Sequence, residues 1–291
     1  MSTVTSPLRN DRPRGRWAGR LFYGYLILSL AIGFVTLGAL LIQVFAKGYK
    51  WFDAVLFLEP PSADPQIAGA EPAILATIYL GILLLVFTVP LGVGTAIYLE
   101  EYANRDRWYN RLLEVNIQNL AAVPSIVYGI LGLAFLVRGI GLGRVLLAGA
   151  MILTLLVLPT VIIAAREAIR AVPDSIRQGA YALGATKWQV VWRQILPAAT
   201  PGVATGAILA LSRGLGETAP LLLVGALTYV SFNPTLLGDF TALPVQVYQW
   251  VARPQEDFRV LAASAIMVLL AINLTLNAFA IWIRNRYERR W

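Results

Sequence analysis

Six segments of the chain are long enough and apolar enough to cross a lipid bilayer as helices. A helix needs about 20 mostly apolar residues to span roughly 30 Å of hydrocarbon. The pattern therefore predicts an all-α, polytopic membrane protein with six transmembrane helices, the third and fourth forming a hairpin around a short turn. The six segments are residues 21–46, 73–98, 115–137, 144–165, 201–230 and 260–283.

The polar stretches around these segments predict three parts of the chain. Residues 1–20 are polar, basic and contain proline, which predicts a disordered cytoplasmic arm close to anionic lipid headgroups. This arm lacks the order of basic region, apolar core and cleavage site typical of a signal peptide. Residues 21–283 form the predicted transmembrane domain, and residues 284–291 form a predicted cytoplasmic tail.

The distribution of lysine and arginine predicts the orientation of the spans. With the N-terminus inside, segments 1–20, 99–114, 166–200 and 284–291 become cytoplasmic and hold 17 of the 24 basic residues. Six lie on the other side, and the remaining one, Arg213, lies within a span. Because loops rich in Lys and Arg stay in the cytoplasm, we expect both termini inside.

Composition excludes several classes of function. The chain is 58% hydrophobic and only 14% charged, with a mean hydropathy of +0.66. It contains no cysteine and no histidine, which excludes disulfides, thiolate chemistry and imidazole metal ligands, and we expect no metal site. The basic excess lies mostly at span ends, so it indicates topology rather than nucleic-acid binding. No GxxxxGK[ST] phosphate loop is present, so an ATP-hydrolysing site of that kind is excluded.

The polar segment 167–200 between the fourth and fifth predicted spans has the pattern of two short helices. Pro173 and Asp174 are typical of a helix start, and Gly184 suits the end of that helix. Thr186 can cap a second helix that carries apolar residues three and four positions apart, and two prolines are expected to end it before the fifth span. Those apolar residues are Trp188, Val191, Trp192 and Ile195, and the prolines are Pro197 and Pro201.

This amphipathic pair has two interpretations that the pattern alone does not separate. Helices with Trp and Arg on opposite faces often lie along the membrane interface. A projecting helix can instead fit a groove on a partner protein.

Two charged residues interrupt the fifth apolar segment. Arg213 and Glu217 are four positions apart, so on one helix they would share a face. A charge near the bilayer centre costs at least about 2.5–3.5 kcal/mol, so such groups face a bundle interior or a water-filled path. One interpretation is an ion pair that locks helix packing. The other is an anion pathway, in which the Arg213 guanidinium carries the anion and Glu217 neutralises it between transport events.

Residues Gln178-Gly179-Ala180, then Gly184, then Leu196-Pro197 resemble the cytoplasmic coupling loop of ABC-importer permeases. That loop has the pattern Glu-Ala-Ala, three residues, Gly, nine residues, Ile, one residue, Leu-Pro. This chain departs from it at Gln178 and Gly179, and has Gln194 in place of Ile.

A wider resemblance extends from the second span to the C-terminus. The segments AVPDSIRQGAYALGATKW, LALSRGLGETAPLLL and LPVQVYQWVARP are similar to the second permease subunit of phosphate-specific ABC transporters. The resemblance implies the ABC type I importer permease fold and a non-enzymatic subunit that translocates inorganic phosphate across a bacterial inner membrane. Phosphonate, sulfate or molybdate are alternative substrates.

The resemblance also implies roles for individual residues. Gln178, Gly179, Ala180, Gly184, Leu196 and Pro197 would lie at or near the contact with an ATPase subunit. Arg213, Glu217 and Thr218 would line the substrate pathway. Arg166, at the inner end of the fourth span, could assist anion exit, although a basic residue there usually reflects topology alone.

The implied partners are a second, homologous permease subunit, a dimer of ATP-binding subunits that hold ATP and Mg, an extracytoplasmic phosphate-binding protein and membrane lipid. No cofactor is expected on this chain. A secondary transporter is a different class, but it usually has inverted repeats, and no repeat is evident. A membrane enzyme is disfavoured because catalytic side chains are scarce.

Overall fold

A computed structural model describes residues 14–104, 106–226 and 230–287. The chain forms two compact units, one up to Ala46 and the other from Lys47 onward. Residues 1–13 of the predicted arm and residues 288–291 of the predicted tail lie outside the described residues.

Helix α1 (Arg14–Gly48) makes up the described part of the first unit. It begins seven residues before the predicted span, so the assignment of residues 14–20 to a disordered arm is wrong. Its large apolar side chains from Leu21 to Phe45 are mostly exposed within this unit, as expected of a helix that is apolar on all sides and meets lipid or another protein.

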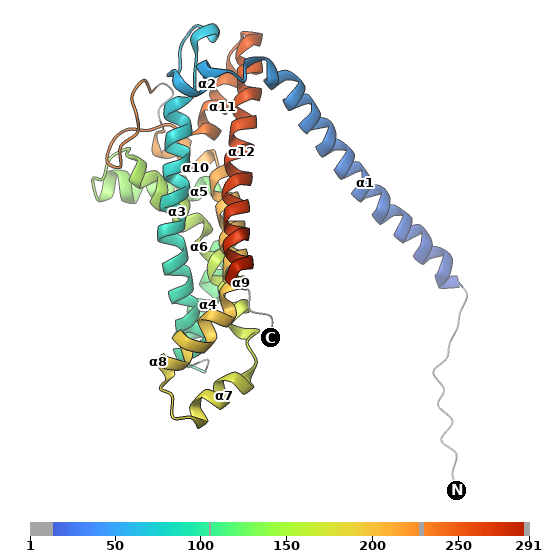
Figure 1. The fold of residues 1–291 in the computed structure, drawn as a ribbon, viewed down its shortest axis with the longest axis vertical. Helices are drawn as coiled ribbons and strands as arrows, with labels where there is room; N and C mark the ends of the chain where they lie inside the picture. Colours follow the sequence, from blue (N-terminus) through green and yellow to red (C-terminus); the bar gives the residue numbers. More distant parts are fainter. Residues whose placement is uncertain (1–13, 105, 227–229, 288–291) are drawn as a thin grey trace. The chain divides into compact units, whose positions relative to one another are not determined.

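Four long helices form the body of the second unit: α3 (Glu71–Ile97), α6 (Leu146–Arg170), α9 (Leu196–Gly216) and α12 (Glu256–Tyr287). Helix α6 packs on both α3 and α9, and α9 packs on α12 (Figure 1). Small residues allow the close approach of α6 and α9, because a Cβ at Gly206 would collide with the Cβ of Ala164. The core between these helices includes Leu80, Leu84, Ile152, Leu153, Leu156, Val157 and Leu211.

The third predicted span, residues 115–137, is not one straight helix. It consists of α4 (Trp108–Ala121), then α5 (Ser125–Gly132) and the π-helical η4 (Leu133–Gly139), with a bend of 106° between the two halves. Pro124 explains the break, because proline disfavours a helical conformation in the residue before it. The Tyr128 hydroxyl donates to the Leu120 carbonyl oxygen at 2.8 Å and so joins the two halves across the bend.

The fifth predicted span, residues 201–230, also breaks. Helix α9 ends at Gly216, Glu217 has an extended backbone (φ −79°, ψ 122°), and the short α10 (Ala219–Val224) follows with Pro220 in its first turn. Helix α10 packs against α5, where a Cβ at Gly129 would come within 2.8 Å of the Pro220 Cα. The second halves of the two broken spans, α5 and α10, therefore pack against each other.

Helix α9 also begins differently from the prediction. Helix α8 (Lys187–Val190), the π-helical η5 (Val191–Ile195) and α9 run on without interruption, so Pro197 and Pro201 lie inside helix and do not end it. Pro197 falls in the first turn of α9, directly after the wider π-helical turn, where a missing backbone N–H costs little.

Segment 47–72 and α11 (Leu243–Ala252) pack together at one end of the second unit, the α11 end. The segment contains η1 (Tyr49–Trp51), α2 (Ala54–Leu58) and η2 (Pro65–Ile67). Helices α7 (Asp174–Ala182) and α8 lie at the opposite end, the α7 end (Figure 1). The α11 end has its own apolar core, which includes Leu56, Leu243, Trp250, Phe258 and Leu261.

Among the described residues, five helices are long and apolar enough to cross a membrane. They are Gly19–Trp51, Glu71–Tyr102, Leu146–Arg170, Lys187–Gly216 and Glu256–Arg286. If the bent pair of α4 and α5 crosses the membrane as one span, the number of spans among the described residues is six. The all-α polytopic prediction is confirmed, with two of the predicted spans broken.

Candidate functional site

The first helix predicted for segment 167–200, the glycine after it and the start of the second helix at Thr186 are confirmed, whereas the second helix continues into α9. Helix α7 follows Pro173 and ends just before Gly184, whose φ of +80° lies in the left-handed region that favours glycine. Thr186 caps α8: its hydroxyl accepts from the Gln189 backbone N–H, and the Gln189 side chain accepts from the Thr186 N–H.

The tip of this segment presents an open surface. Gln178, Gly179 and Gly184 are exposed, and a Cβ at either glycine would meet nothing within 4 Å. Leu183 at the end of α7 is 90% exposed, which leaves a large apolar side chain at the tip without cover from the described residues. Ala180 is partly buried. The surface suits the close approach of another chain.

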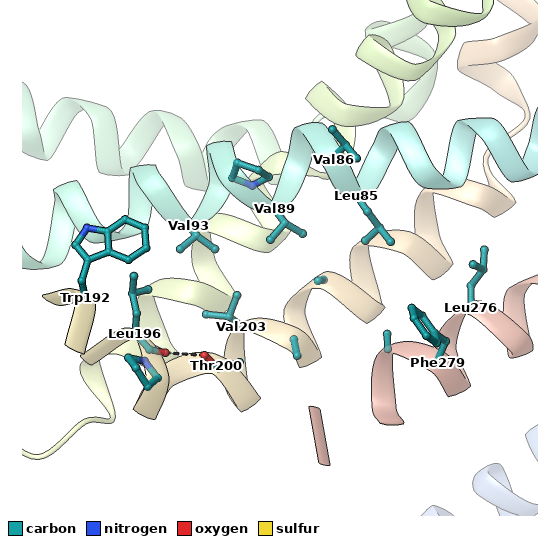
Figure 2. A pocket seen from close by; sticks show the side chains of 15 residues that line it. Leu85, Val86, Val89, Val93, Trp192, Leu196, Thr200, Val203, Leu276 and Phe279 are labelled. Atoms are coloured by element: carbon teal, nitrogen blue, oxygen red, sulfur yellow. Dashed lines mark hydrogen bonds between the residues drawn. The ribbon is translucent and has the colours of Figure 1, made fainter. Parts of the chain in front are cut away.

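Leu196 and Pro197 do not share that surface. They lie in the first turn of α9, where they line an apolar cavity instead (Figure 2). The resemblance places all six residues at the ATPase contact. In the structure, some of them lie at the exposed tip and the others at the start of α9.

The apolar residues of α8 and η5 do not share one face. Val191 and Ile195 are buried against Ile169 of α6, whereas Trp188 and Trp192 are exposed, with ring centroids 5.1 Å apart. The four residues are thus divided between the packed and the open side of this helix. The turn at η5 is π-helical, since the Leu196 N–H donates to the Val191 carbonyl oxygen, five positions back.

Arg166 is buried, and it lies in a cluster of charges at the α7 end. Its Nε is 2.8 Å from Glu100 Oε1 and its Nη2 is 2.6 Å from Glu114 Oε1. Arg170, one turn later on α6, also contacts Glu100 at 2.8 Å. The Arg166 guanidinium is thus engaged by two carboxylates from other elements, and its role in a substrate pathway stays a prediction.

Arg177 of α7 joins the same region. Its guanidinium contacts Glu101 at 3.1 Å and Asp174 at 3.1 Å, and it donates to the Ile169 and Val172 carbonyl oxygens at 2.9 and 2.6 Å. Sequence reasoning missed this cluster because charges at span ends were attributed to topology. The sequence did contain a signal for these ion pairs. Two adjacent carboxylates, Glu100 and Glu101, follow the second predicted span, and Arg166 and Arg170 follow the fourth.

Arg213, Glu217 and Thr218 are brought together at the break between α9 and α10. Arg213 Nε is 3.8 Å from Glu217 Oε1, too far for a hydrogen bond, and their side chains are 42% and 21% exposed. Glu217 is the C-cap residue of α9, one position beyond the last helical residue, and the predicted ion pair with Arg213 four positions back forms. Thr218 is partly buried and directly precedes α10.

A polar contact between α9 and α12 lies next to Arg213 in the sequence. The Asn277 side-chain amide donates to the Ser212 hydroxyl at 2.7 Å and to the Asn273 Oδ1 at 3.1 Å. The sequence analysis did not single out these residues, because their pairing depends on how α9 and α12 pack. Hydrogen bonds of this kind commonly join helices within a membrane.

A cavity of about 850 Å³ lies among α3, η5, α9 and α12, and its lining is almost wholly apolar (Figure 2). The Thr200 hydroxyl in its wall donates to the Leu196 carbonyl oxygen at 2.7 Å, shown as the dashed line in Figure 2. Because an unpaired charge in such surroundings loses its hydration without compensation, the cavity is unsuited to an anion. Its labelled lining residues are Leu85, Val86, Val89, Val93, Trp192, Leu196, Thr200, Val203, Leu276 and Phe279.

Comparison with known proteins assigns the family. The profile of the family described as "Binding-protein-dependent transport system inner membrane component" matches residues 88–290. The chain belongs to this family. The matched region contains both the α7 segment and the break at Glu217. As a family member, the chain is a multi-pass permease component of an ABC importer and lacks an ATPase domain of its own.

Curated relatives cover almost the whole chain. The phosphate transport system permease protein PstA of Yersinia pestis is 32% identical over 291 residues, covering 95% of this chain and 97% of the relative. PstA 1 of Mycobacterium tuberculosis H37Rv is 30% identical over 273 residues, covering 91% and 87%.

Solved structures confirm the fold. A chain of a bacterial alginate ABC transporter, solved with its alginate-bound periplasmic protein, matches with a TM-score of 0.68 and 17% identity, covering 94% of this chain and 96% of that one. A chain of the MetNI methionine ABC transporter matches with a TM-score of 0.58 and 21% identity, covering 75% and 94%. The ABC-importer permease fold is therefore shown for this chain.

Proposed function

We propose that this permease subunit passes inorganic phosphate inward across the bacterial inner membrane, with both termini and the α7 end in the cytoplasm. The observation that most supports this proposal is Arg213 at the helix break, whose contact with Glu217 is too long for a hydrogen bond. Relatives named as phosphate permeases at about 30% identity support phosphate over other oxyanions. The excess of basic residues in the segments on the α7 side supports the orientation.

The helix break makes Arg213 suitable for a mobile anion. A guanidinium can donate two parallel hydrogen bonds to a phosphate, which a single point charge cannot do. Its contact with Glu217 is long and partly exposed, so an anion can displace the carboxylate at little cost. The extended backbone at Glu217 interrupts the helix at this point, as discontinuous helices do at the substrate sites of secondary transporters.

The exposed tip of α7 supports a contact with an ATP-binding subunit. Leu183 and the unobstructed Gly179 can enter a groove on that partner, since no described side chain covers them. In the proposed complex, a pair of ATP-binding subunits holds ATP and Mg, a second permease subunit completes the pathway, and an extracytoplasmic phosphate-binding protein delivers the substrate. This chain itself holds no cofactor in the proposal.

Phosphate uptake by Arg213→Gln tests the proposed pathway. In an assembled complex, we expect uptake to fall by at least about tenfold, because Gln lacks the charge that offsets anion dehydration. The matched control is Arg259→Gln on α12, an exposed arginine without an ion pair among the described residues, which should transport normally.

Undiminished uptake by the Arg213 variant would remove this residue from the mechanism. Sulfate, molybdate and a phosphonate are tested as competitors of labelled phosphate uptake. If one of them inhibits uptake more strongly than unlabelled phosphate does, that anion replaces phosphate as the proposed substrate. Uptake that persists without any co-purifying ATP-binding subunit would indicate a secondary transporter.

A further inference from the structure

Two adjacent carboxylates at the end of α3 connect different helices. Glu100 and Glu101 lie in the π-helical turn η3 (Tyr98–Tyr102), where the Ala103 N–H donates to the Tyr98 carbonyl oxygen five positions back. Consecutive side chains on a helix point in different directions, so the two carboxylates face different neighbours. Glu100 is bound by arginines of α6, and Glu101 by the arginine of α7.

We propose that Arg177 and Glu101 form a latch that transmits movement of α7 to the transmembrane helices. The proposal rests on the proposed function, in which α7 is the helix that meets the ATP-binding subunit. Arg177 is a positioning residue here: it does not touch substrate or nucleotide but makes α7 move together with α3 and α6.

Helix α7 depends on this latch because it is otherwise weakly attached. None of its nine residues is buried, and only Ile176 and Ala180 pack partly against the apolar core at this end. Arg177 supplies the polar attachment, with Glu101 on one side and the Ile169 and Val172 carbonyl oxygens on the other. The Ile169 carbonyl belongs to the last turn of α6, where backbone acceptors lack partners within the helix.

The carboxylates that continue the connection from α7 to the other helices are buried. The side chains of Glu100 and Glu101 are only 3% and 8% exposed. Glu100 is held by Arg166 and Arg170 of α6, and Arg166 also binds Glu114 of α4. A displacement of Arg177 therefore acts on the end of α3 and, through the adjacent Glu100, on α6 and α4. Ion pairs that are desolvated and short resist stretching far more than exposed ones.

Uncoupling of ATP hydrolysis from transport tests the latch. Complexes carrying Arg177→Gln, Glu101→Gln or both are purified through a tag on this chain, then compared for ATPase rate and phosphate uptake per assembled complex. We expect uptake to fall about tenfold with ATPase changed less than about twofold, since coupling between sites is typically worth 5- to 150-fold. The double variant should lose no more than Arg177→Gln alone, because the contact with Glu101 is already absent in that variant.

Two matched variants separate positioning from charge. Asp174→Asn removes the second carboxylate that contacts Arg177. Because the Asp174 side chain is 83% exposed, this variant should leave the ATPase rate and the uptake rate unchanged. Arg177→Lys keeps the charge but lacks the planar fork that reaches Glu101 and two carbonyl oxygens at once, so uptake should recover in part.

The latch is overturned if Arg177→Gln transports normally, if ATPase and uptake fall in parallel, or if the two single losses add. A wild-type preparation that contains no ATP-binding subunit would overturn the proposed function, and the latch with it. If only the latch proposal is wrong, the wild-type complex still hydrolyses ATP and takes up phosphate. The two outcomes are therefore distinguishable.

Discussion

Two arginine clusters of the second unit differ in how fully their charges are paired. At the α7 end, Arg166 and Arg177 make short contacts of 2.6–3.1 Å with carboxylates, and Glu100 and Glu101 are buried. At the break after α9, Arg213 reaches Glu217 only at 3.8 Å and stays 42% exposed. A fully paired guanidinium holds helices together, whereas a loosely paired one has donors left for a mobile anion.

The largest effect on stability is expected from Arg166→Gln. Without Arg166 the buried Glu100 keeps only the half-exposed Arg170, so the free energy of unfolding should fall by about 3 kcal/mol, the lower end of the cost of breaking a buried pair. Arg170→Gln, which removes a half-exposed partner of the same Glu100, should cost about 1 kcal/mol or less. Unfolding in mixed micelles with increasing denaturing detergent compares the two, and equal losses would contradict the distinction between buried and exposed partners.

A smaller effect on binding is expected from Glu217→Gln. Removing the carboxylate that competes for Arg213 should tighten phosphate binding to the purified complex by at most about fivefold, the size typical of an exposed ion pair. Equilibrium binding of labelled phosphate measures the change. Weaker binding would show that Glu217 helps to hold the anion and would end its assignment as a competitor.

The smallest effect is expected from Arg213→Gln on stability. Because the side chain is partly exposed and its ion contact is long, the free energy of unfolding should change by less than about 1 kcal/mol. The same detergent titration used for Arg166→Gln measures it. A loss as large as that of Arg166→Gln would mean that the pair locks helix packing, which is the structural interpretation left open by the sequence.

Local signals in the sequence predicted local structure well. The start of α7 after Pro173, the left-handed Gly184 and the capping role of Thr186 were all predicted, because each depends on the residue and its immediate neighbours. The residues around Arg213 were also recognised before the structure, since a charge inside an apolar run is conspicuous. Their roles in transport remain proposals.

Features that depend on packing between distant segments were predicted poorly. The bend at Pro124 and the break at Glu217 were taken as continuous spans, because span prediction considers only length and polarity. The helix continues through Pro197 and Pro201, and the π-helical turn directly before Pro197 cannot be predicted from apolar spacing. The pairing of Arg177 with Glu101 joins residues 76 positions apart.

By itself, the sequence determined that this chain is a helical membrane permease and where its polar loop lies, since the bilayer requires long apolar helices and excludes charge from them. Only the tertiary structure decided which charges are paired and which remain available. The physical reason is that Arg166, Arg177 and Arg213 carry the same charged group, and their difference comes entirely from the carboxylates and carbonyl oxygens that folding brings within reach.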